Sequence, residues 1–454
     1  MGAGILIGAY IGISVYYNDR FYANTKINGI DFSGKSVADV QKYMKDSAKG
    51  YQLTIKELDG KEEVIKGDEI GLKFQDNGQI KKLKKKQNGF LWPKAFFADQ
   101  DVDIKLETMY DAGALEQRMK TLNCVTRKDQ TEAVNAAPKY DGSAFVIEPE
   151  VSGSKIDSAM LEKKLGQKIS GYQETLELEP EGCYIKAKYT SESEEVKNAR
   201  DLLNKYCGAS ITYDMAPASE VVDRNLISTW VTCDENYAVS LNQDAVAAYM
   251  SEFGKKYDTK GKTRPITTPW GKNTEVSGGT YGWEIDEAGE TEALTASILA
   301  GEVITKQPAY VNTAVTHGDQ DWGNTYIEVD LSDQHMWYIV DGGVTFESDV
   351  VTGKPVPARQ TPAGVYSILE RLRNKVLVGN ILPETGKPEY ETPVDYWARV
   401  TYTGIGFHDA NWQAAFGGSR YISHGSHGCI NMPPSAAAAF YDMIAVGTPV
   451  VMHY

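Results

Sequence analysis

The stretch Ser423-His424-Gly425-Ser426-His427-Gly428-Cys429-Ile430-Asn431 places a cysteine between a histidine–glycine pair and a hydrophobic residue. Its thiol needs a partner to react, because a free cysteine with a pKa of about 8.5 is mostly protonated at neutral pH. Gly428 has no side chain, so a substrate can approach the backbone closely there, and nearby N–H groups of Gly428 and Cys429 are then able to face a developing oxyanion. The stretch therefore predicts a nucleophilic cysteine at Cys429.

A base for this thiol is available upstream, at His408. Residues 394–408 alternate in polarity, which predicts β-structure with Tyr396, Ala398 and His408 on one face. Such a strand would end at His408 and aim its imidazole into a cleft. There the ring can accept the thiol proton and later return it to a leaving amine. We therefore expect His408 to be the general base for Cys429.

The order and spacing of His408 and of Ser426-His427-Gly428-Cys429-Ile430-Asn431 resemble the signature of the L,D-transpeptidases, the YkuD-type cysteine enzymes of peptidoglycan. The resemblance extends over residues 326–454 and implies a mostly β, β-sandwich-like catalytic domain at residues 324–454. One position differs from many members, in which an arginine follows the hydrophobic residue; here it is Asn431. If that arginine binds a substrate carboxylate, this chain must use another group.

The expected site combines the motif with residues around it. We expect Cys429, His408 and His427 to be catalytic. The residues expected to hold the oxyanion or the substrate are Gly428, Ser426, Asn431, Asp409, His424 and Trp397. Asp409 follows His408 directly, but a backbone carbonyl can hold the imidazole tautomer equally well. His427 either positions the loop or the oxyanion, or is packed for structural reasons.

A metal site is the competing interpretation of the three histidines. His408, His424 and His427 together with a cysteine could bind a transition metal. Glycine and serine spacers in a tight turn suit an oxyanion loop better than zinc coordination, and no Cys-x-x-Cys spacing occurs in the chain. We therefore expect no metal and no cofactor. A metal-dependent amidase stays as an alternative class.

The N-terminus carries an uncharged, apolar stretch over residues 2–17. A bilayer-spanning helix needs about 20 apolar residues, with about 17 as the lower limit, so the stretch is marginal. No lysine or arginine precedes it, so the usual positive-inside signal is missing. We nevertheless expect residues 1–20 to be a membrane anchor helix, with the rest of the chain outside the cell and facing the wall. A buried core helix is the alternative.

Two stretches between the N-terminus and the catalytic segment look like copies of each other. Ile156-Asp157 and Ile285-Asp286 each follow glycine and precede an apolar helix, and extended residues 175–179 and 309–311 come after. Aspartate is a favoured helix N-cap. The recurrence predicts two α+β modules, residues 21–193 and 194–315. They resemble the peptidoglycan-binding domain ahead of the catalytic domain in some Gram-positive L,D-transpeptidases; a spacer without binding function is the alternative.

Composition limits the remaining possibilities. The 454 residues predict roughly three domains, at about 150 residues each. The formal net charge of −15 argues against a nucleic-acid partner. Besides Cys429 there are four cysteines: Cys124, Cys183, Cys207 and Cys233. They either form two disulfides, with three possible pairings, or remain buried thiols.

The function implied by the resemblance is acyl transfer through a thioester on Cys429. The acyl donor would be the third residue of a peptidoglycan tetrapeptide stem, with loss of terminal D-alanine, and the acceptor a side-chain amine of a second stem. Water as acceptor would make the protein an L,D-carboxypeptidase. A wall-binding protein with an inactive cysteine site is the alternative from another class. The resemblance also implies that carbapenems acylate the cysteine.

Overall fold

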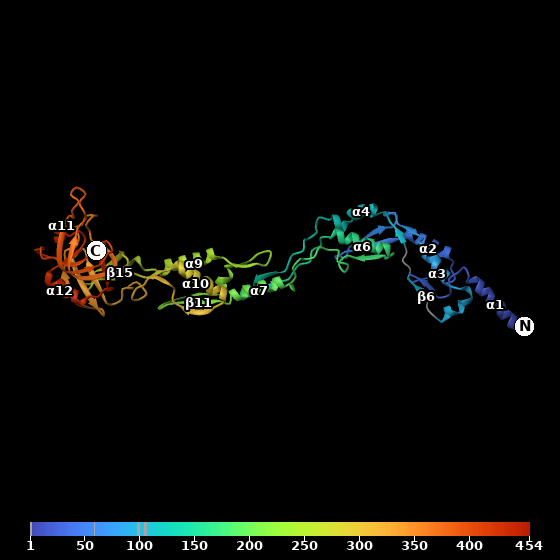
Figure 1. The fold of residues 1–454 in the computed structure, drawn as a ribbon, viewed down its shortest axis with the longest axis horizontal. Helices are drawn as coiled ribbons and strands as arrows, with labels where there is room; N and C mark the ends of the chain where they lie inside the picture. The colour runs from blue at the N-terminus through green and yellow to red at the C-terminus, as the bar shows by residue number, and fades with distance from the viewer. Residues whose placement is uncertain (1, 59, 98–99, 104–106) are drawn as a thin grey trace. The chain divides into compact units, whose positions relative to one another are not determined.

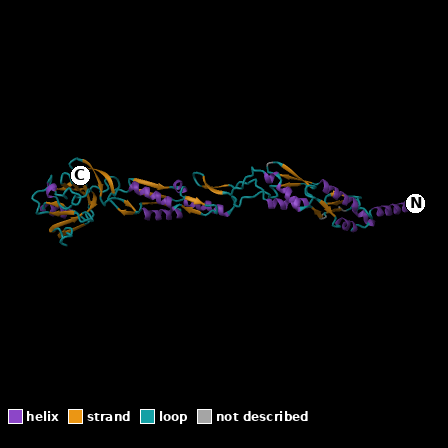
Figure 2. Cartoon of the chain, turned by 90° about the horizontal axis from the view of Figure 1, so that it is seen from above, coloured by secondary structure: helices purple, strands orange, loops and turns teal. Residues whose placement is uncertain are grey.

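The computed structural model describes residues 2–58, 60–97, 100–103 and 107–454. The chain divides into two compact units (Figure 1), Met1–Lys139 with Ile147–Lys197, and Tyr140–Val146 with Asn198–Tyr454. The fold is multi-domain: α+β modules precede a mostly β C-terminal domain. Figure 2 shows that helices are concentrated in the modules, while strands and loops dominate the C-terminal region.

The first unit has two hydrophobic cores, one N-terminal and one in the module. The N-terminal core includes Phe21, Ile27 and Val40, and α2 enters it behind a capping box formed by Ser36 and Asp39. The elements of this unit are α1 (Gly2–Tyr16), β1 (Thr25–Ile27), β2 (Ile30–Asp31), α2 (Val37–Gly50), β3 (Gln52–Lys56), β4 (Glu62–Lys66), β5 (Lys73–Gln75), α3 (Gln79–Lys85), η1 (Gly89–Phe96), β6 (Gln100–Val102), β7 (Glu107–Met109), α4 (Ala112–Lys120), α5 (Asn123–Thr126), β8 (Ala137–Tyr140), β9 (Phe145–Glu148), α6 (Ser158–Ser170) and β10 (Thr175–Glu177).

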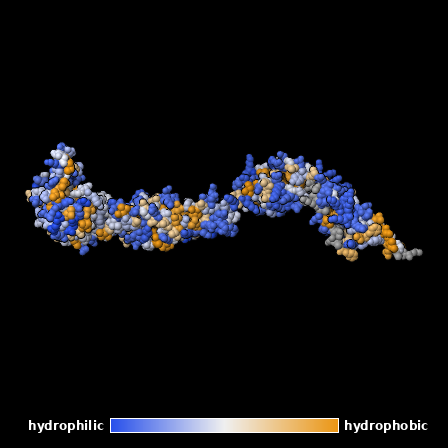
Figure 3. Space-filling view, viewed as in Figure 1, coloured by the Kyte–Doolittle hydropathy of each residue, from blue (hydrophilic) through white to orange (hydrophobic). Residues whose placement is uncertain are grey.

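The expected membrane anchor is wrong. Helix α1 has 15 residues, which at about 1.5 Å per residue is roughly 22 Å and shorter than the roughly 30 Å hydrocarbon core of a bilayer. Within the described residues, no helix is both long and apolar enough to cross a membrane. The helix instead contacts η1, where the Tyr10 hydroxyl donates to the Phe90 carbonyl at 2.5 Å and the Tyr10 ring lies 6.0 Å from Trp92. Its apolar outer side chains are visible at the N-terminal end in Figure 3.

The predicted duplication is present in the sheet topology. In the first unit, strand β10 pairs in parallel with β3 of the β3–β4 hairpin, and α6 precedes β10. In the second unit, β18 (Val303–Lys306) follows α10 (Glu287–Ala300) and pairs in parallel with β11 (Ser210–Met215), which forms a hairpin with β12 (Ala218–Val222). The side chains of Asp157 and Asp286 cap α6 and α10 as predicted.

One strand of the second module was placed wrongly. The segment at 309–311, matched above to 175–179, corresponds instead to residues around Cys183. Asp157 N–H donates to the Cys183 carbonyl, and Asp286 N–H donates to the Ala309 carbonyl. In the second module, β18 takes the place that β10 has in the first module. The polarity pattern of the sequence did not reveal this equivalence.

The remaining elements of the second module surround the sheet β12-β11-β18. They are α7 (Glu194–Tyr206), α8 (Arg224–Ser228), β13 (Val231–Cys233), β14 (Val239–Leu241), α9 (Gln243–Tyr257), β15 (Gly261–Thr267), β16 (Asn273–Gly278), β17 (Glu284–Ile285) and β19 (Tyr310–Asn312). The β15–β16 hairpin leaves this module and packs on the C-terminal domain, where Ile266 and Val276 share a buried cluster with Trp337 and Val451.

The cysteines outside the motif are thiols. All five cysteines of the chain are free. Cys124 and Cys183 lie in the core of the first unit, and Cys207 lies in the core of the second module. Burial raises the pKa of Cys183 and of Cys207 to about 11. Of the two alternatives for these residues, the structure has the unpaired thiols.

The C-terminal domain consists of two sheets packed over one core that includes Ile327, Phe407 and Phe440. The first sheet has the order β22-β21-β20-β28-β23 and the second the order β24-β25-β26-β27. The elements are β20 (Tyr326–Asp330), β21 (His335–Val340), β22 (Gly343–Asp349), β23 (Gly364–Ser367), β24 (Glu370–Val378), β25 (Glu391–Arg399), β26 (Gly406–Asp409), α11 (Arg420–His424), β27 (Ile430–Met432), α12 (Pro434–Met443) and β28 (Pro449–His453).

Candidate active site

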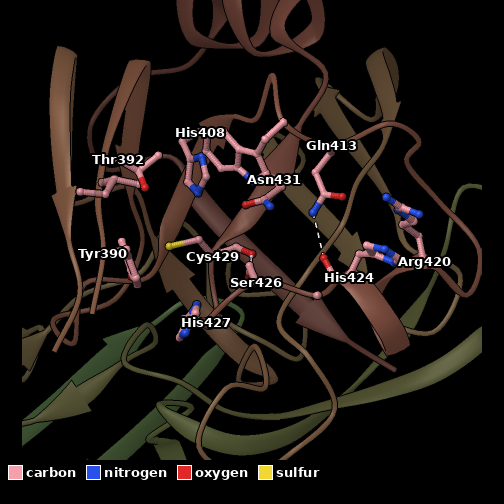
Figure 4. Close-up of a pocket in the computed structure, with 13 residues that line it drawn as sticks. Tyr390, Thr392, His408, Gln413, Arg420, His424, Ser426, His427, Cys429 and Asn431 are labelled. Atoms are coloured by element: carbon pink, nitrogen blue, oxygen red, sulfur yellow. Dashed lines mark hydrogen bonds between the residues drawn. The ribbon is translucent and has the colours of Figure 1, made fainter. Parts of the chain in front are cut away.

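Two short parallel strands bring the motif residues together. β26 pairs with β27 in a register that sets His408 beside Asn431. Cys429 directly precedes β27, two residues before Asn431, so the period-two alternation of a strand favours the same face for both. All three residues line one pocket (Figure 4). The expected single alternating run at 394–408 is in fact β25 and β26, antiparallel partners joined by a turn at residues 400–405.

The pocket has a volume of about 370 Å³, within the range of about 300–1,000 Å³ that small-molecule sites occupy. Its lining residues are Leu377, Tyr390, Thr392, His408, Trp412, Gln413, Arg420, His424, Gly425, Ser426, His427, Cys429 and Asn431. In Figure 4 the Cys429 sulfur points toward the side on which His408 and Tyr390 lie.

The Cys429 thiol is neutral at rest. Burial raises its pKa to about 11, partly opposed by a backbone hydrogen bond from Gly406. Its Sγ lies 3.8 Å from the Gly404 carbonyl, to which the S–H can donate. At neutral pH the thiolate is therefore scarce, so any nucleophilic reaction of this sulfur would require removal of its proton.

The His408 imidazole is held by a backbone hydrogen bond. Its Nδ1 is 2.8 Å from the backbone carbonyl of Asp409; since a carbonyl only accepts, Nδ1 carries the hydrogen and Nε2 is left with its lone pair. Burial lowers the pKa of His408, and the bond to the Asp409 carbonyl opposes this shift in part. The ring is thus neutral at pH 7. The rings of Trp397 and Trp412 lie 6.2 Å and 5.8 Å from it.

Hydrogen bonds fix the loop before Cys429. Gly428 N–H donates to Ser426 Oγ at 3.0 Å, and that hydroxyl donates to the Cys429 carbonyl at 2.6 Å. Thr361 Oγ1 donates to the Gly428 carbonyl at 2.7 Å. Gly428 N–H is therefore already occupied, whereas within the described residues no hydrogen bond engages the N–H of Cys429. Of the two expected oxyanion donors, Cys429 N–H is the one that is free for a ligand.

The backbone at Gly428 requires glycine. Its φ is +125°, and a Cβ there would lie 3.0 Å from the Ile405 side chain. The left-handed φ lets the chain turn sharply between Ser426 and Cys429.

The other two histidines have partners of their own. His427 is exposed, and its Nε2 lies 3.0 Å from Glu389, which also binds Arg359 at 2.8 Å. His424 Nδ1 lies 2.7 Å from Ser423 Oγ. In the described ranges, no three histidine, cysteine or carboxylate side chains converge as metal ligands would. The geometry of this pocket fits a thiol–imidazole pair better than a metal centre.

Comparison with known proteins agrees with this geometry. The family model described as the L,D-transpeptidase catalytic domain, YkuD, matches residues 324–452. The model for a peptidoglycan binding domain matches twice, at residues 64–177 and 189–304, about half of the chain. The chain belongs to the L,D-transpeptidases with a YkuD domain.

Individual relatives match the YkuD domain and the region before it. L,D-transpeptidase 1 of Mycobacterium tuberculosis is 32% identical over 96 residues, 21% of this chain and 37% of the relative. A cysteine-to-serine mutant of the Enterococcus faecium L,D-transpeptidase is 36% identical over 56% of this chain and 98% of that chain, with a TM-score of 0.47. The catalytic domain of the E. faecium protein is 46% identical over 28% of this chain and 96% of that chain, with a TM-score of 0.26. Measured against the M. tuberculosis L,D-transpeptidase 1, this chain spans little more than a third of the relative's length.

Three expected site residues of the YkuD domain lie outside the pocket lining: Gly428, described above, Asp409 and Trp397. The carboxylate of Asp409 accepts from the N–H groups of Asp395 and Tyr396, both at 2.9 Å, and so ties β26 to β25. Trp397 is buried, and its indole N–H donates to Glu370 at 2.9 Å. Both residues support the sheet that carries His408.

Several residues that line the pocket of the YkuD domain escaped the sequence reasoning. Leu377, Tyr390 and Thr392 come from the β24–β25 hairpin, and Gln413 and Arg420 come from the segment between β26 and β27. No motif marks them, because they reach the pocket through the fold and not through their spacing from Cys429. Only Arg420 could have been found from the sequence, because it is a basic residue that lies shortly before the motif.

Proposed function

We propose that the protein is a peptidoglycan L,D-transpeptidase that joins the third residues of two stem peptides through a thioester on Cys429. The observation that carries the proposal is the pairing of β26 with β27, which sets His408 beside the segment of Cys429 in one pocket. The fixed Nδ1 hydrogen bond of His408 supports the role of its Nε2 as base. Membership of the YkuD family supports the same reaction.

In the acylation step, Cys429 Sγ attacks the carbonyl carbon of the third, L-configured residue of a tetrapeptide stem. His408 Nε2 takes the thiol proton as the carbon–sulfur bond forms, and Cys429 N–H donates to the developing oxyanion. The carbon–nitrogen bond then breaks, and the proton on His408 passes to the leaving amine of D-alanine. The product is a thioester, and free D-alanine departs.

In the transfer step, a side-chain amine of a second stem attacks the thioester carbonyl. The amine loses a proton to His408 Nε2, the carbon–sulfur bond breaks, and the thiolate of Cys429 recovers a proton from the imidazolium. The new amide bond links the two third residues. If water attacks in place of the amine, the product is a shortened stem, and the protein acts as an L,D-carboxypeptidase.

We further propose that residues 21–193 and 194–315 are modules that hold the YkuD domain of residues 324–454 at the cell wall. The two matches to the peptidoglycan binding domain support this role. A spacer would do the same without affinity for glycan. Sedimentation of the Cys429→Ala protein with purified wall sacculi, at increasing salt, separates the two: a spacer would remain in the supernatant at every salt concentration.

The decisive experiment is intact-mass spectrometry of products from a disaccharide-tetrapeptide, with the wild-type protein and with Cys429→Ala. Loss of D-alanine together with a dimer mass, absent in the variant, would support transpeptidation. A tripeptide without dimer would support the carboxypeptidase. Activity that resists iodoacetamide and is lost with a chelator would favour the metal-dependent amidase, and no turnover with a thiol unreactive to a carbapenem would favour a wall-binding protein.

A further inference from the structure

The pocket around Cys429 has two chemically different sides. One side is formed by the β24–β25 hairpin through Leu377, Tyr390 and Thr392. Across the pocket, Figure 4 shows Gln413, Arg420 and His424 together. A substrate that crosses the sulfur therefore meets apolar and aromatic groups on one side and a cation on the other.

Arg420 is the one permanently charged side chain among the thirteen lining residues. Its Nε is buried and donates to no acceptor, and within the described part of the chain no carboxylate forms an ion pair with it. A buried donor without a partner carries a desolvation cost, which is larger for a charged group. A pocket-lining guanidinium with no ion-pair partner among the described residues is suited to an anionic ligand.

The segment that carries Arg420 is held in place by backbone contacts. Arg420 begins the short helix α11, and its N–H lies 3.4 Å from the Gly417 carbonyl. At the other end of the helix, Gln413 Nε2 donates to the His424 carbonyl at 2.8 Å, shown as the dashed line in Figure 4. These bonds fix the base of the Arg420 side chain before any ligand arrives.

We propose that Arg420 binds the terminal carboxylate of the donor stem and so selects donors that end in a free carboxylate one residue beyond the attacked carbonyl. This inference rests on the proposed function and names its donor specificity. A single residue extends the chain by about 3.5 Å, so the carboxylate of the leaving D-amino acid stays within the same pocket as Cys429. A planar guanidinium matches a carboxylate with two parallel N–H···O bonds.

Because Asn431 is neutral, another group has to bind the terminal carboxylate. Asn431 is buried beside His408, and its Oδ1 has no hydrogen-bond donor within the described residues. An amide oxygen can accept from a substrate N–H, but it cannot attract a carboxylate. Charge recognition in this pocket therefore falls to Arg420.

The test compares two donors, a disaccharide-tetrapeptide with a free terminal carboxylate and the same molecule with a terminal amide. With the wild-type protein we expect kcat/KM to be higher for the acid by about 10- to 100-fold, the effect of one charge-assisted interaction. Arg420→Met should remove this preference by lowering kcat/KM for the acid while the amide stays within about twofold. Arg420→Lys, which keeps the charge but loses the planar fork, should restore part of it.

Two controls make the result specific. Arg200→Met removes an arginine of α7 that pairs with Asp201, outside the pocket, and should leave the acid-to-amide ratio unchanged. The alkylation rate of Cys429 by iodoacetamide reports whether the pocket of Arg420→Met is intact. Equal losses for acid and amide in Arg420→Met would overturn the inference, since they would mean a structural role.

A binding measurement separates this inference from the proposed reaction. In the Cys429→Ala background, calorimetric titration with acid and amide donors needs no turnover. If no donor is turned over, yet the acid binds more tightly and Arg420→Met abolishes the difference, the reaction proposal fails and the carboxylate site stands. If turnover is normal and the variant leaves the acid-to-amide ratio unchanged, the carboxylate site fails and the reaction proposal stands.

Discussion

For the single residues of the pocket, burial shifts the pKa values of the Cys429 thiol and the His408 imidazole in opposite directions. Removing water disfavours the charged form of each group, so the pKa of the Cys429 thiol rises to about 11 and the pKa of His408 falls. The resting pair is therefore S–H and neutral imidazole, and not thiolate and imidazolium. In the reaction proposed above, proton transfer from Cys429 to His408 therefore accompanies the attack on the substrate.

The pH dependence of alkylation tests this resting state. Because only the thiolate reacts and the pKa of Cys429 is raised, the rate of modification by iodoacetamide should increase about tenfold for each pH unit from 7 to 10, without a plateau below about pH 10. Peptide mass spectrometry of Cys429, with Cys429→Ser as the blank for the other cysteines, measures the rate. A plateau near neutral pH would instead show a preformed thiolate–imidazolium pair.

Gly428→Ala tests the loop geometry. The substitution places a Cβ at a φ of +125° and 3.0 Å from Ile405, and strain of this kind, which costs about 1–3 kcal/mol, should lower kcat/KM by about 10- to 100-fold through a displaced Cys429 N–H. Gly447→Ala is the matched control, because Gly447 has a φ of +90° with open space around its missing Cβ and lies outside the pocket lining. It should reduce stability but not kcat; equal kcat losses in both variants would contradict the explanation.

Among the secondary-structure elements, the β24–β25 hairpin contributes the pocket wall opposite Arg420. Its tip is attached at Glu389, which accepts from Arg359 at 2.8 Å and lies 3.0 Å from His427 Nε2. The bond from His427 is the largest cause of the lowered pKa of Glu389. A carboxylate with a lowered pKa keeps its charge, and hence this attachment, as the pH falls to 5, and loses it only in more acidic solution.

Glu389→Gln should loosen the hairpin tip. The neutral amide weakens the contacts to Arg359 and His427, so we expect faster hydrogen–deuterium exchange at residues 379–390, measured by mass spectrometry at pH 7. Glu384→Gln changes the same charge in the same loop at a position outside the pocket lining and should exchange like the wild type. Wild-type protection in both variants would show that strand pairing alone holds the tip.

Across the whole molecule, the β15–β16 hairpin connects the second module to the YkuD domain. Arg264 on β15 forms a buried ion pair with Asp321 at 2.6 Å, and both side chains are almost completely buried. Its guanidinium also lies 5.3 Å from the ring of Trp322. Gly279 touches the Val365 backbone so closely that a Cβ would lie 2.0 Å from the carbonyl oxygen. The hairpin is thus tied to the segment directly before the YkuD domain and, at Gly279, to Val365 of the domain itself.

Arg264→Met tests this connection. The substitution leaves Asp321 as an uncompensated buried charge, which typically costs about 3–5 kcal/mol in the free energy of unfolding. Urea unfolding followed by tryptophan fluorescence should show the loss in the transition of the YkuD domain. Lys255→Met breaks an exposed ion pair with Glu252 in the same module and should leave that transition unchanged. A loss below about 1 kcal/mol for Arg264→Met would mean that Asp321 takes up a proton or water in compensation.

The local patterns in the sequence predicted a large part of the structure. Asp157 and Asp286 marked the two helices of the repeat, because a cap depends on residues within one turn. The motif around Cys429 indicated the pocket, because the loop contacts of Ser426 and Gly428 join residues two or three positions apart. The anchor expected at residues 1–20 failed because apolar composition alone does not reveal that α1 is only 15 residues long.

The sequence by itself thus determined the family, the duplicated modules, and Cys429 and His408 as candidate catalytic residues. Each of these depends on short spacings between residues or on strand and helix periodicity, which a single sequence shows directly. The tertiary structure decided which groups surround them. Arg420 lines the pocket and Glu389 contacts the lining residue His427, both from outside the motif, and Arg264 meets Asp321 across 57 positions. Such contacts depend on how strands and hairpins pack, and packing between distant segments leaves no periodic pattern in a single sequence.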